Sequence, residues 1–121
     1  MSFRNLPAAS LKVDGRMTSL RVYEASHFLA RARGLLGRER LDRDEALWIR
    51  PCGSVHTIGM RYAIDLVFVD AEQRVLSVKR QIEPLRFAGH AGARSTIELL
   101  AGTAAVVWIM PGSKLEKVAV S

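Results

Sequence analysis

Two neighbouring apolar segments, IDLVFVD at residues 64–70 and RVLSVKRQI at residues 74–82, constrain the fold more than any other feature of the chain. In the second segment Leu76, Val78 and Ile82 share one face, as in a strand with one buried side. The first segment is apolar on both faces, which is typical of a strand that is covered on both sides. Because only three residues separate the segments, they predict an antiparallel hairpin.

Shorter segments predict further strands and two helices. The strands are expected at residues 11–13 and 20–23 around a turn at Asp14–Gly15, at 46–49 before Pro51, at 96–100 and at 115–120. The helices are expected after a cap at Ser26, from the spacing of Phe28, Leu29, Ala32 and Leu35, and as one or two turns within 101–109.

This order of elements predicts a mainly β (α+β) fold, namely a compact single-domain antiparallel barrel-like sheet with two short helices. We expect residues 1–10 to be a flexible N-terminal arm, because they are polar and rich in proline and alanine. Residues 11–121 would then form the domain. The segment 84–94, with one proline and two glycines, is expected to be an irregular loop that is long enough to bind a partner.

Composition narrows the classes of protein. None of the apolar runs in the 121 residues approaches the about 20 that span a bilayer, and we recognise no signal peptide, so we expect a cytoplasmic protein without a membrane partner. The single cysteine, Cys52, cannot form an intrachain disulfide, and the three histidines are too scattered for a zinc site. Because no phosphate-binding, hydrolase or metalloprotease motif is present, we expect neither a metal nor a cofactor.

Residues 52–65, CGSVHTIGMRYAID, gather the side chains that could do chemistry. Cys52 and His56 suggest a thiolate–imidazolium pair, but the two can meet only if the segment curls, and we favour a packed cysteine instead. Asp65 opens a strand with two apolar faces and therefore needs a partner, which could be Arg61 or His56. The cluster is thus a structural network, which we favour, or an active site in which Asp65 orients His56.

The formal charge of +6 is unevenly distributed. Between residues 74 and 94 the acidic Glu83 stands against five basic residues, which are Arg74, Lys79, Arg80, Arg86 and Arg94. Arginine suits bidentate binding of carboxylate or phosphate, so this region is either a solvated basic surface or a docking face for an anionic partner. Without interleaved aromatic residues or a reading helix, nucleic acid is the less favoured partner.

Several of these motifs, taken in order, resemble the bacterial and archaeal family known as domain of unknown function 192. The matching segments between about Ala32 and Lys117 are RARGLLGR, CGSVHTIGMRYAIDLVFVD, RVLSVKRQIEP, GARSTIELLAG and the Pro-Gly turn before the last strand. The resemblance implies a compact mainly β domain with short helices and no agreed activity.

The same resemblance implies a shared set of polar site residues. In this chain they are His56, Thr57, Met60, Arg61, Asp65 and Glu98, with Arg33 and Gly34 upstream. Three positions depart from the family pattern. Ala63 replaces a proline, Gln73 replaces a glycine in the hairpin turn, and Ser113 replaces an aspartate. If the turn needs a positive φ, Gln73 is less favourable there than glycine.

Three functional hypotheses follow, in this order. The first is a binding or accessory domain whose polar pocket or partner surface lies around residues 52–65, with Glu98, Arg86 and Arg94 contributing. Its partner would be an anionic small molecule or a protein, and exposed strand edges would permit a homodimer. The second is an enzyme that acts on a small anionic substrate through Cys52, His56 and Asp65, and the third is association with nucleic acid through the basic surface.

Overall fold

The computed structural model describes residues 3–26, 40–56 and 62–120. The elements in chain order are a 3-10 turn η1 (Phe3–Asn5), strands β1 (Ala8–Val13), β2 (Arg16–Ala25), β3 (Glu45–Ile49), β4 (Ser54–His56), β5 (Ile64–Val69), β6 (Val75–Ile82), β7 (Phe87–Gly89) and β8 (Ser95–Leu100), helix α2 (Thr103–Val106), and strand β9 (Leu115–Ala119).

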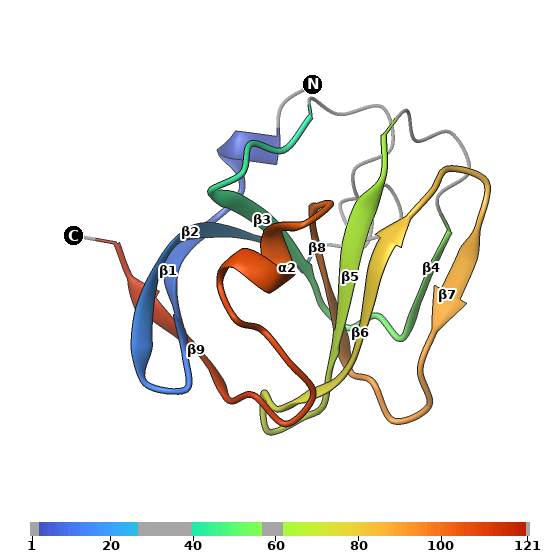
Figure 1. Cartoon of the computed structure of the whole chain (residues 1–121). Helices are drawn as coiled ribbons and strands as arrows, with labels where there is room; N and C mark the ends of the chain where they lie inside the picture. Colours follow the sequence, from blue (N-terminus) through green and yellow to red (C-terminus); the bar gives the residue numbers. More distant parts are fainter. Residues whose placement is uncertain (1–2, 27–39, 57–61, 121) are drawn as a thin grey trace.

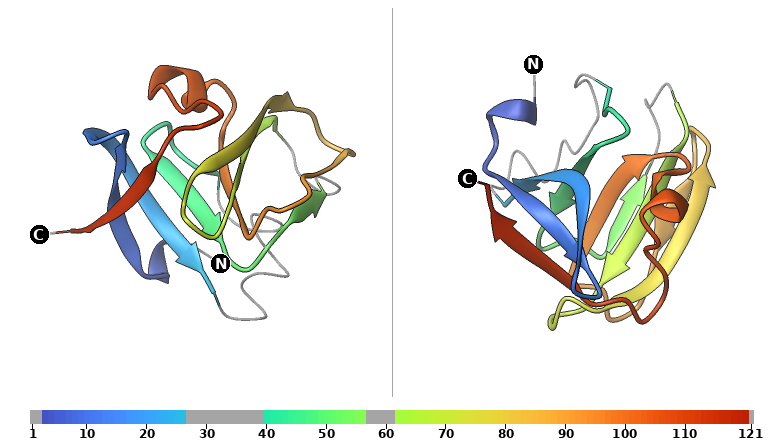
Figure 2. Two further views of the ribbon diagram at one scale, coloured as in Figure 1. Left: turned by 90° about the horizontal axis from the view of Figure 1, so that it is seen from below. Right: turned by 60° about the vertical axis from the view of Figure 1, so that its left-hand side comes forward.

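Seven strands form one curled sheet in the order β6-β5-β8-β3-β2-β1-β9, which Figure 2 shows from two directions. The edge strands β6 and β9 meet near their first residues, where Arg74 and Lys114 form an isolated bridge, and the sheet is not closed. Strand β2 pairs with β3 in parallel, whereas the other pairs are antiparallel. The mainly β prediction is confirmed, but the antiparallel barrel is corrected to an open mixed sheet, because the long connection over residues 26–44 allows a parallel crossover.

The two predicted hairpins are present. In β5–β6 the register includes Val67 opposite Val78, and the turn is closed by Asp70, whose Oδ1 accepts hydrogen bonds of 2.9 Å from the amides of Glu72 and Arg74. Gln73 in this turn has φ 64°, so the position does adopt the left-handed conformation that glycine favours. In β1–β2 both turn residues, Asp14 and Gly15, have positive φ, which matches the right-handed twist of a two-residue hairpin.

The central strands β3, β5 and β8 of the main sheet are buried on both faces. One face, which we call the α2 face, carries Trp48, Val67 and Ile97, which cluster with Ala104 of α2. Figure 1 shows α2 in the opening of the curled sheet, between β1–β2 and β5–β6. The opposite face, which we call the ribbon face, carries the aliphatic and aromatic side chains that cluster with residues of β4 and β7; these are Leu47, Leu66 and Phe68, with Val55 and Ala88 from the two short strands. Adjacent residues of a strand therefore point into different cores.

The N-terminal segment differs from the flexible arm that we expected. Residues 3–10 form η1 and the first half of β1, and the Phe3 ring is fully buried, with an edge-to-face contact to Tyr23 at a centroid distance of 5.1 Å. Burying an aromatic side chain removes a large apolar area from water. The burial of Phe3 can therefore hold this segment on the sheet although most of its other residues are polar or small.

The helices were predicted only in part. In the ranges given above, α2 is the single α-helix and η1 is a 3-10 turn, so two short helices are not found there. The helix expected after Ser26 falls on residues 27–39, outside the described residues. The expected loop 84–94 contains the strand β7. No helix in the described part of the chain is long and apolar enough to cross a membrane.

Candidate functional site

Strands β4 and β7 form a separate antiparallel ribbon beside the main sheet (Figure 1), in which Ser54 lies opposite Gly89 and His56 opposite Phe87. Glycine suits position 89, since an added Cβ would make a tight contact of 3.0 Å with the Cβ of Ser54. We call residues 50–56 and 84–94 the ribbon surface. It contains most of the candidate residues that the structure describes.

Main-chain hydrogen bonds fix the base of this ribbon. The Cys52 amide donates to the Arg94 carbonyl over 2.9 Å, and the Arg94 amide donates to Val69 of β5 over 2.8 Å. The hydroxyl of Thr96 donates to the Cys52 carbonyl over 3.0 Å. The half-buried thiol of Cys52 lies 3.1 Å from the Ser54 carbonyl oxygen. Cys52 therefore sits in a defined main-chain frame, with exposed Arg94 beside it.

Asp65 lies on the α2 face and is fully buried. Its Oδ1 accepts a hydrogen bond of 2.9 Å from the Gln81 amide, and its Oδ2 accepts bonds of 3.0 Å from the amides of Gly102 and Ala104. The carboxylate thus joins β5 to a bulge of β6 and to the start of α2. Three amide donors explain how a carboxylate is accommodated in an apolar core.

Glu98 lies on the ribbon face, in register with Leu47 of β3 and Leu66 of β5, and is 2% exposed. Burial raises the pKa of Tyr62, the Leu41 amide opposes this, and the negative charge of Glu98 adds to the rise. The charge of Glu98 thus contributes to the raised pKa of Tyr62, a half-buried residue that packs against the ribbon-face core.

The structure separates the predicted cluster into two groups. Asp65 pairs in register with Leu99 and points to the α2 face, whereas Cys52 packs against the ribbon-face core that also holds Leu66. Asp65 and Cys52 are therefore not brought together, and the pairing of Asp65 with His56 that the enzyme hypothesis also allows stays a prediction. The main chain of His56 lies in β4. Arg33, Thr57, Met60 and Arg61 lie outside the described residues.

Two apolar residues of the ribbon surface were missed in the sequence. Leu85 is 67% exposed and has φ 67°, and Phe87 is 77% exposed. They flank Arg86, which is also exposed. The signal that could have found them is an alternation of apolar and basic residues, Leu-Arg-Phe, inside a proline- and glycine-containing segment.

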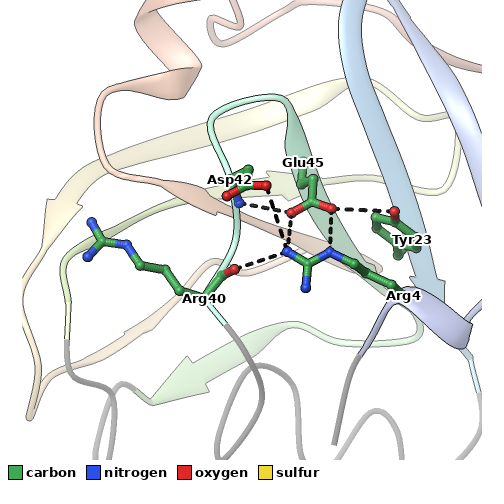
Figure 3. Close-up of polar contacts among 5 residues, drawn as sticks. All are labelled: Arg4, Tyr23, Arg40, Asp42 and Glu45. Atoms are coloured by element: carbon green, nitrogen blue, oxygen red, sulfur yellow. Dashed lines mark hydrogen bonds and ion pairs between the residues drawn. The ribbon is translucent and has the colours of Figure 1, made fainter.

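A second polar cluster, also missed, joins the N-terminal turn to the sheet (Figure 3). Arg4 donates from Nε to Oε2 of Glu45 over 2.8 Å and from Nη2 to Oε1 over 2.7 Å, and the Asp42 amide donates to Oε1 over 2.9 Å. Burial raises the pKa of Glu45, but the hydrogen bonds and charge of Arg4, with the Asp42 amide and the Tyr23 hydroxyl, bring it below its usual value. We interpret this cluster as a clamp that holds η1 on β3.

In the described ranges, no three histidine, cysteine or acidic side chains lie close enough together to hold a metal ion.

The chain belongs to the family of domain of unknown function 192, described as "Uncharacterized ACR", whose profile matches residues 9–117. The family expected from the sequence is thereby confirmed. No curated protein of established function matches the chain.

Two solved structures are similar. One is a protein of unknown function from Novosphingobium aromaticivorans, with 25% identity, a TM-score of 0.77, and coverage of 92% of this chain and 86% of that one. The other is a protein from Sinorhizobium meliloti called a "putative transcription regulator", with 18% identity, a TM-score of 0.82, and coverage of 97% and 96%. The second likeness shows the fold alone.

Proposed function

We propose that this protein is a binding domain whose recognition site is the ribbon surface, and that its partner is anionic. The observation that carries the proposal is Leu85, which is exposed and held in the left-handed conformation next to exposed Phe87. A bulky residue in that conformation costs about 1–2 kcal/mol. An exposed side chain does not offset this cost by burial in the folded chain.

Strained residues of this kind concentrate at sites where a ligand or partner is bound. The apolar side chain of Leu85 is exposed in the folded chain. A partner that covers it would therefore remove apolar surface from water that folding leaves exposed. Phe87 extends the same surface along β7, opposite His56 of β4. A contact with both would bury an aliphatic and an aromatic group at the centre of the site, as interaction hot spots do.

The charged residues around these apolar residues favour a partner of negative charge. Four exposed arginines lie on the ribbon surface and on the neighbouring β6, namely Arg50, Arg80, Arg86 and Arg94. Glu83 is the acidic residue between β6 and the ribbon segment 84–94. Guanidinium groups pair with carboxylates in a bidentate way. A partner with acidic and apolar groups interleaved, such as an acidic segment of a protein, matches this pattern better than a uniform polyanion.

A titration with two polymers tests this. The ¹⁵N-labelled full chain is titrated with a random copolymer of glutamate and tyrosine, and separately with polyglutamate, while amide chemical shifts are followed. We expect the copolymer to bind more tightly, with shifts confined to residues 50–56 and 84–94. Leu85→Gly should weaken copolymer binding several-fold without changing polyglutamate binding, whereas Arg86→Gln should weaken both. His56→Ala and Arg61→Ala, measured in the same way, test the sequence-based binding residues.

Arg21→Gln is the matched control, because Arg21 is an exposed arginine of β2 and lies over the Tyr23 ring rather than on the ribbon. It should bind both polymers as the parent does. Equal effects of Arg21→Gln and Arg86→Gln would mean that only net charge matters and would overturn the proposal. Binding of a DNA duplex that is tighter than binding of the copolymer, and that falls steeply with salt, would favour nucleic acid instead.

A further inference from the structure

The end of α2 has the hydrogen bonds of a helix stop that normally requires glycine. The Trp108 amide donates to the Ala105 carbonyl over 3.2 Å, and the Ile109 amide donates to Ala104 over 2.9 Å. This pair of bonds is the Schellman motif, and its left-handed position is usually glycine. Here the position holds Trp108, with φ 61°. The apolar residues that accompany the motif are also present, since Ala104 and Ile109 are both fully buried and belong to the same hydrophobic cluster.

The tryptophan gains little from folding in this position. Its side chain is 65% exposed, and the residues two positions before and after it in the sequence are also exposed, Val106 by 73% and Met110 by 47%. We call these three residues the Trp108 patch. Glycine would satisfy the same hydrogen bonds without strain, so neither the local backbone nor the core explains a tryptophan here.

The charges around the Trp108 patch are balanced, unlike those of the chain as a whole. Arg16 donates to the Val107 carbonyl over 3.1 Å and Arg74 donates to Gly112 over 2.9 Å, so the two turns that carry them, 14–16 and 70–74, lie against the loop 106–114. These three segments hold three cations, Arg16, Arg74 and Lys114, and three anions, Asp14, Asp70 and Glu72. Their net charge is zero, whereas the chain carries +6.

We propose that the Trp108 patch is the contact through which two copies of this chain associate about a two-fold axis. Two molecules of charge +6 repel one another, and the repulsion is smallest where each presents a neutral region. A two-fold contact places the same patch on both sides, so cations of one copy can face anions of the other while the two indoles pack together. A strongly anionic partner would gain nothing from this balanced rim, in contrast to the ribbon surface.

The size of the patch sets the strength of the contact. Three partly exposed side chains offer on the order of 300 Å² of apolar surface, well below the about 800 Å² per partner of a standard interface. The dimer is therefore weak, with a dissociation constant on the order of 0.1–1 mM.

Sedimentation equilibrium of the full chain over a concentration series up to about 1 mM tests the proposal. The parent should show a monomer–dimer equilibrium, and Trp108→Gly should raise the dissociation constant at least tenfold while its melting temperature stays equal to or above that of the parent. Trp108→Asn, which also tolerates the left-handed conformation, serves if the glycine variant misfolds. Leu85→Gly is the matched control, because it removes the other exposed left-handed apolar residue, and it should leave the equilibrium unchanged.

A parent that stays monomeric throughout the series, or a dimer that Trp108→Gly leaves intact, overturns the proposal. So does a monomeric parent that co-sediments with phosphatidylcholine vesicles through Trp108, which would assign the patch to a lipid surface. These outcomes are independent of the polymer titrations, since the Trp108 patch shares no residue with the ribbon surface.

Discussion

Replacing Asp65 by asparagine is the sharpest test of how this fold is held together, because the side-chain volume is kept and the charge is removed. Asp65 accepts three amide hydrogen bonds in the core, one on Oδ1 and two on Oδ2. Asparagine has a single acceptor oxygen. In its best orientation it keeps the bonds from Gly102 and Ala104, and its NH₂ group then faces the Gln81 amide, where two donors meet.

The magnitude follows from these contacts. One charge-assisted bond, contributing about 2 kcal/mol, is lost, and the two that remain change from charged to neutral and weaken by about 0.5 kcal/mol each. Asp65→Asn should therefore lower the free energy of unfolding by about 3 kcal/mol. We expect part of this destabilisation to be local to Gln81. This residue has φ 54° and lies where the β5–β6 register shifts between Ile64 and Leu66, so the bond to Asp65 helps to hold an irregular part of the strand.

Urea unfolding gives the total, and amide hydrogen exchange gives its location. Exchange should accelerate most at Gln81, Gly102 and Ala104. Asp70→Asn is the control, because Asp70 accepts two amide bonds in an exposed turn, and it should change the free energy of unfolding by less than about 1 kcal/mol. A loss below about 1 kcal/mol in Asp65→Asn, or unchanged exchange at the three amides, would refute the reasoning.

Three further predictions concern stability. Arg4→Ala should lower the free energy of unfolding by about 2 kcal/mol near neutral pH, since it leaves the buried Glu45 carboxylate without its cation. The folded pKa of Glu45 lies below its usual value, so this contribution is present above the unfolded pKa and is lost as the pH falls through the folded pKa. Urea titrations should therefore show that the difference in unfolding free energy between parent and variant shrinks below about pH 4.5. A difference that does not change with pH would contradict the clamp. Phe3→Ala should cost about 3 kcal/mol in the same assay, and a change under about 1 kcal/mol would mean that η1 contributes little. Gln73→Gly should raise the melting temperature slightly, equivalent to about 0.5 kcal/mol, because φ is 64° there; a fall would show that the turn is not strained.

Local patterns in the sequence predicted the strands that pair with their neighbours along the chain. The β5–β6 hairpin is specified by alternation and a three-residue turn, and the β1–β2 hairpin by Asp14–Gly15. The parallel pairing of β2 with β3 depends on the path of a long connection, which no local pattern encodes. Strand β7 was missed because three residues ending in glycine, Phe87–Gly89, carry no detectable alternation.

In the candidate site, too, local features could be predicted from the sequence and long-range contacts could not. That Asp65 needs a partner was predicted from its place in a strand with two apolar faces. Its partners proved to be amides of two segments that lie 16 to 39 residues away, and main-chain donors have no signature in sequence. Leu85 and Trp108 were not singled out, because exposure and a left-handed backbone become visible only when the chain is folded.

The alkylation of Cys52 by a charged and a neutral reagent tests most directly whether the ribbon surface favours anions. Cys52 is the single cysteine. Two exposed arginines are near it: Arg50 precedes it by two residues, and the Arg94 carbonyl accepts a hydrogen bond from its amide. Two cations at about 8 Å attract an anion by roughly 1 kcal/mol at low salt, which is roughly a fivefold effect. The rate of iodoacetate relative to iodoacetamide should thus be roughly fivefold higher in the folded chain than in urea, and should fall in Arg94→Gln and with added salt. A ratio equal to that of the unfolded chain would contradict an anion-binding ribbon surface.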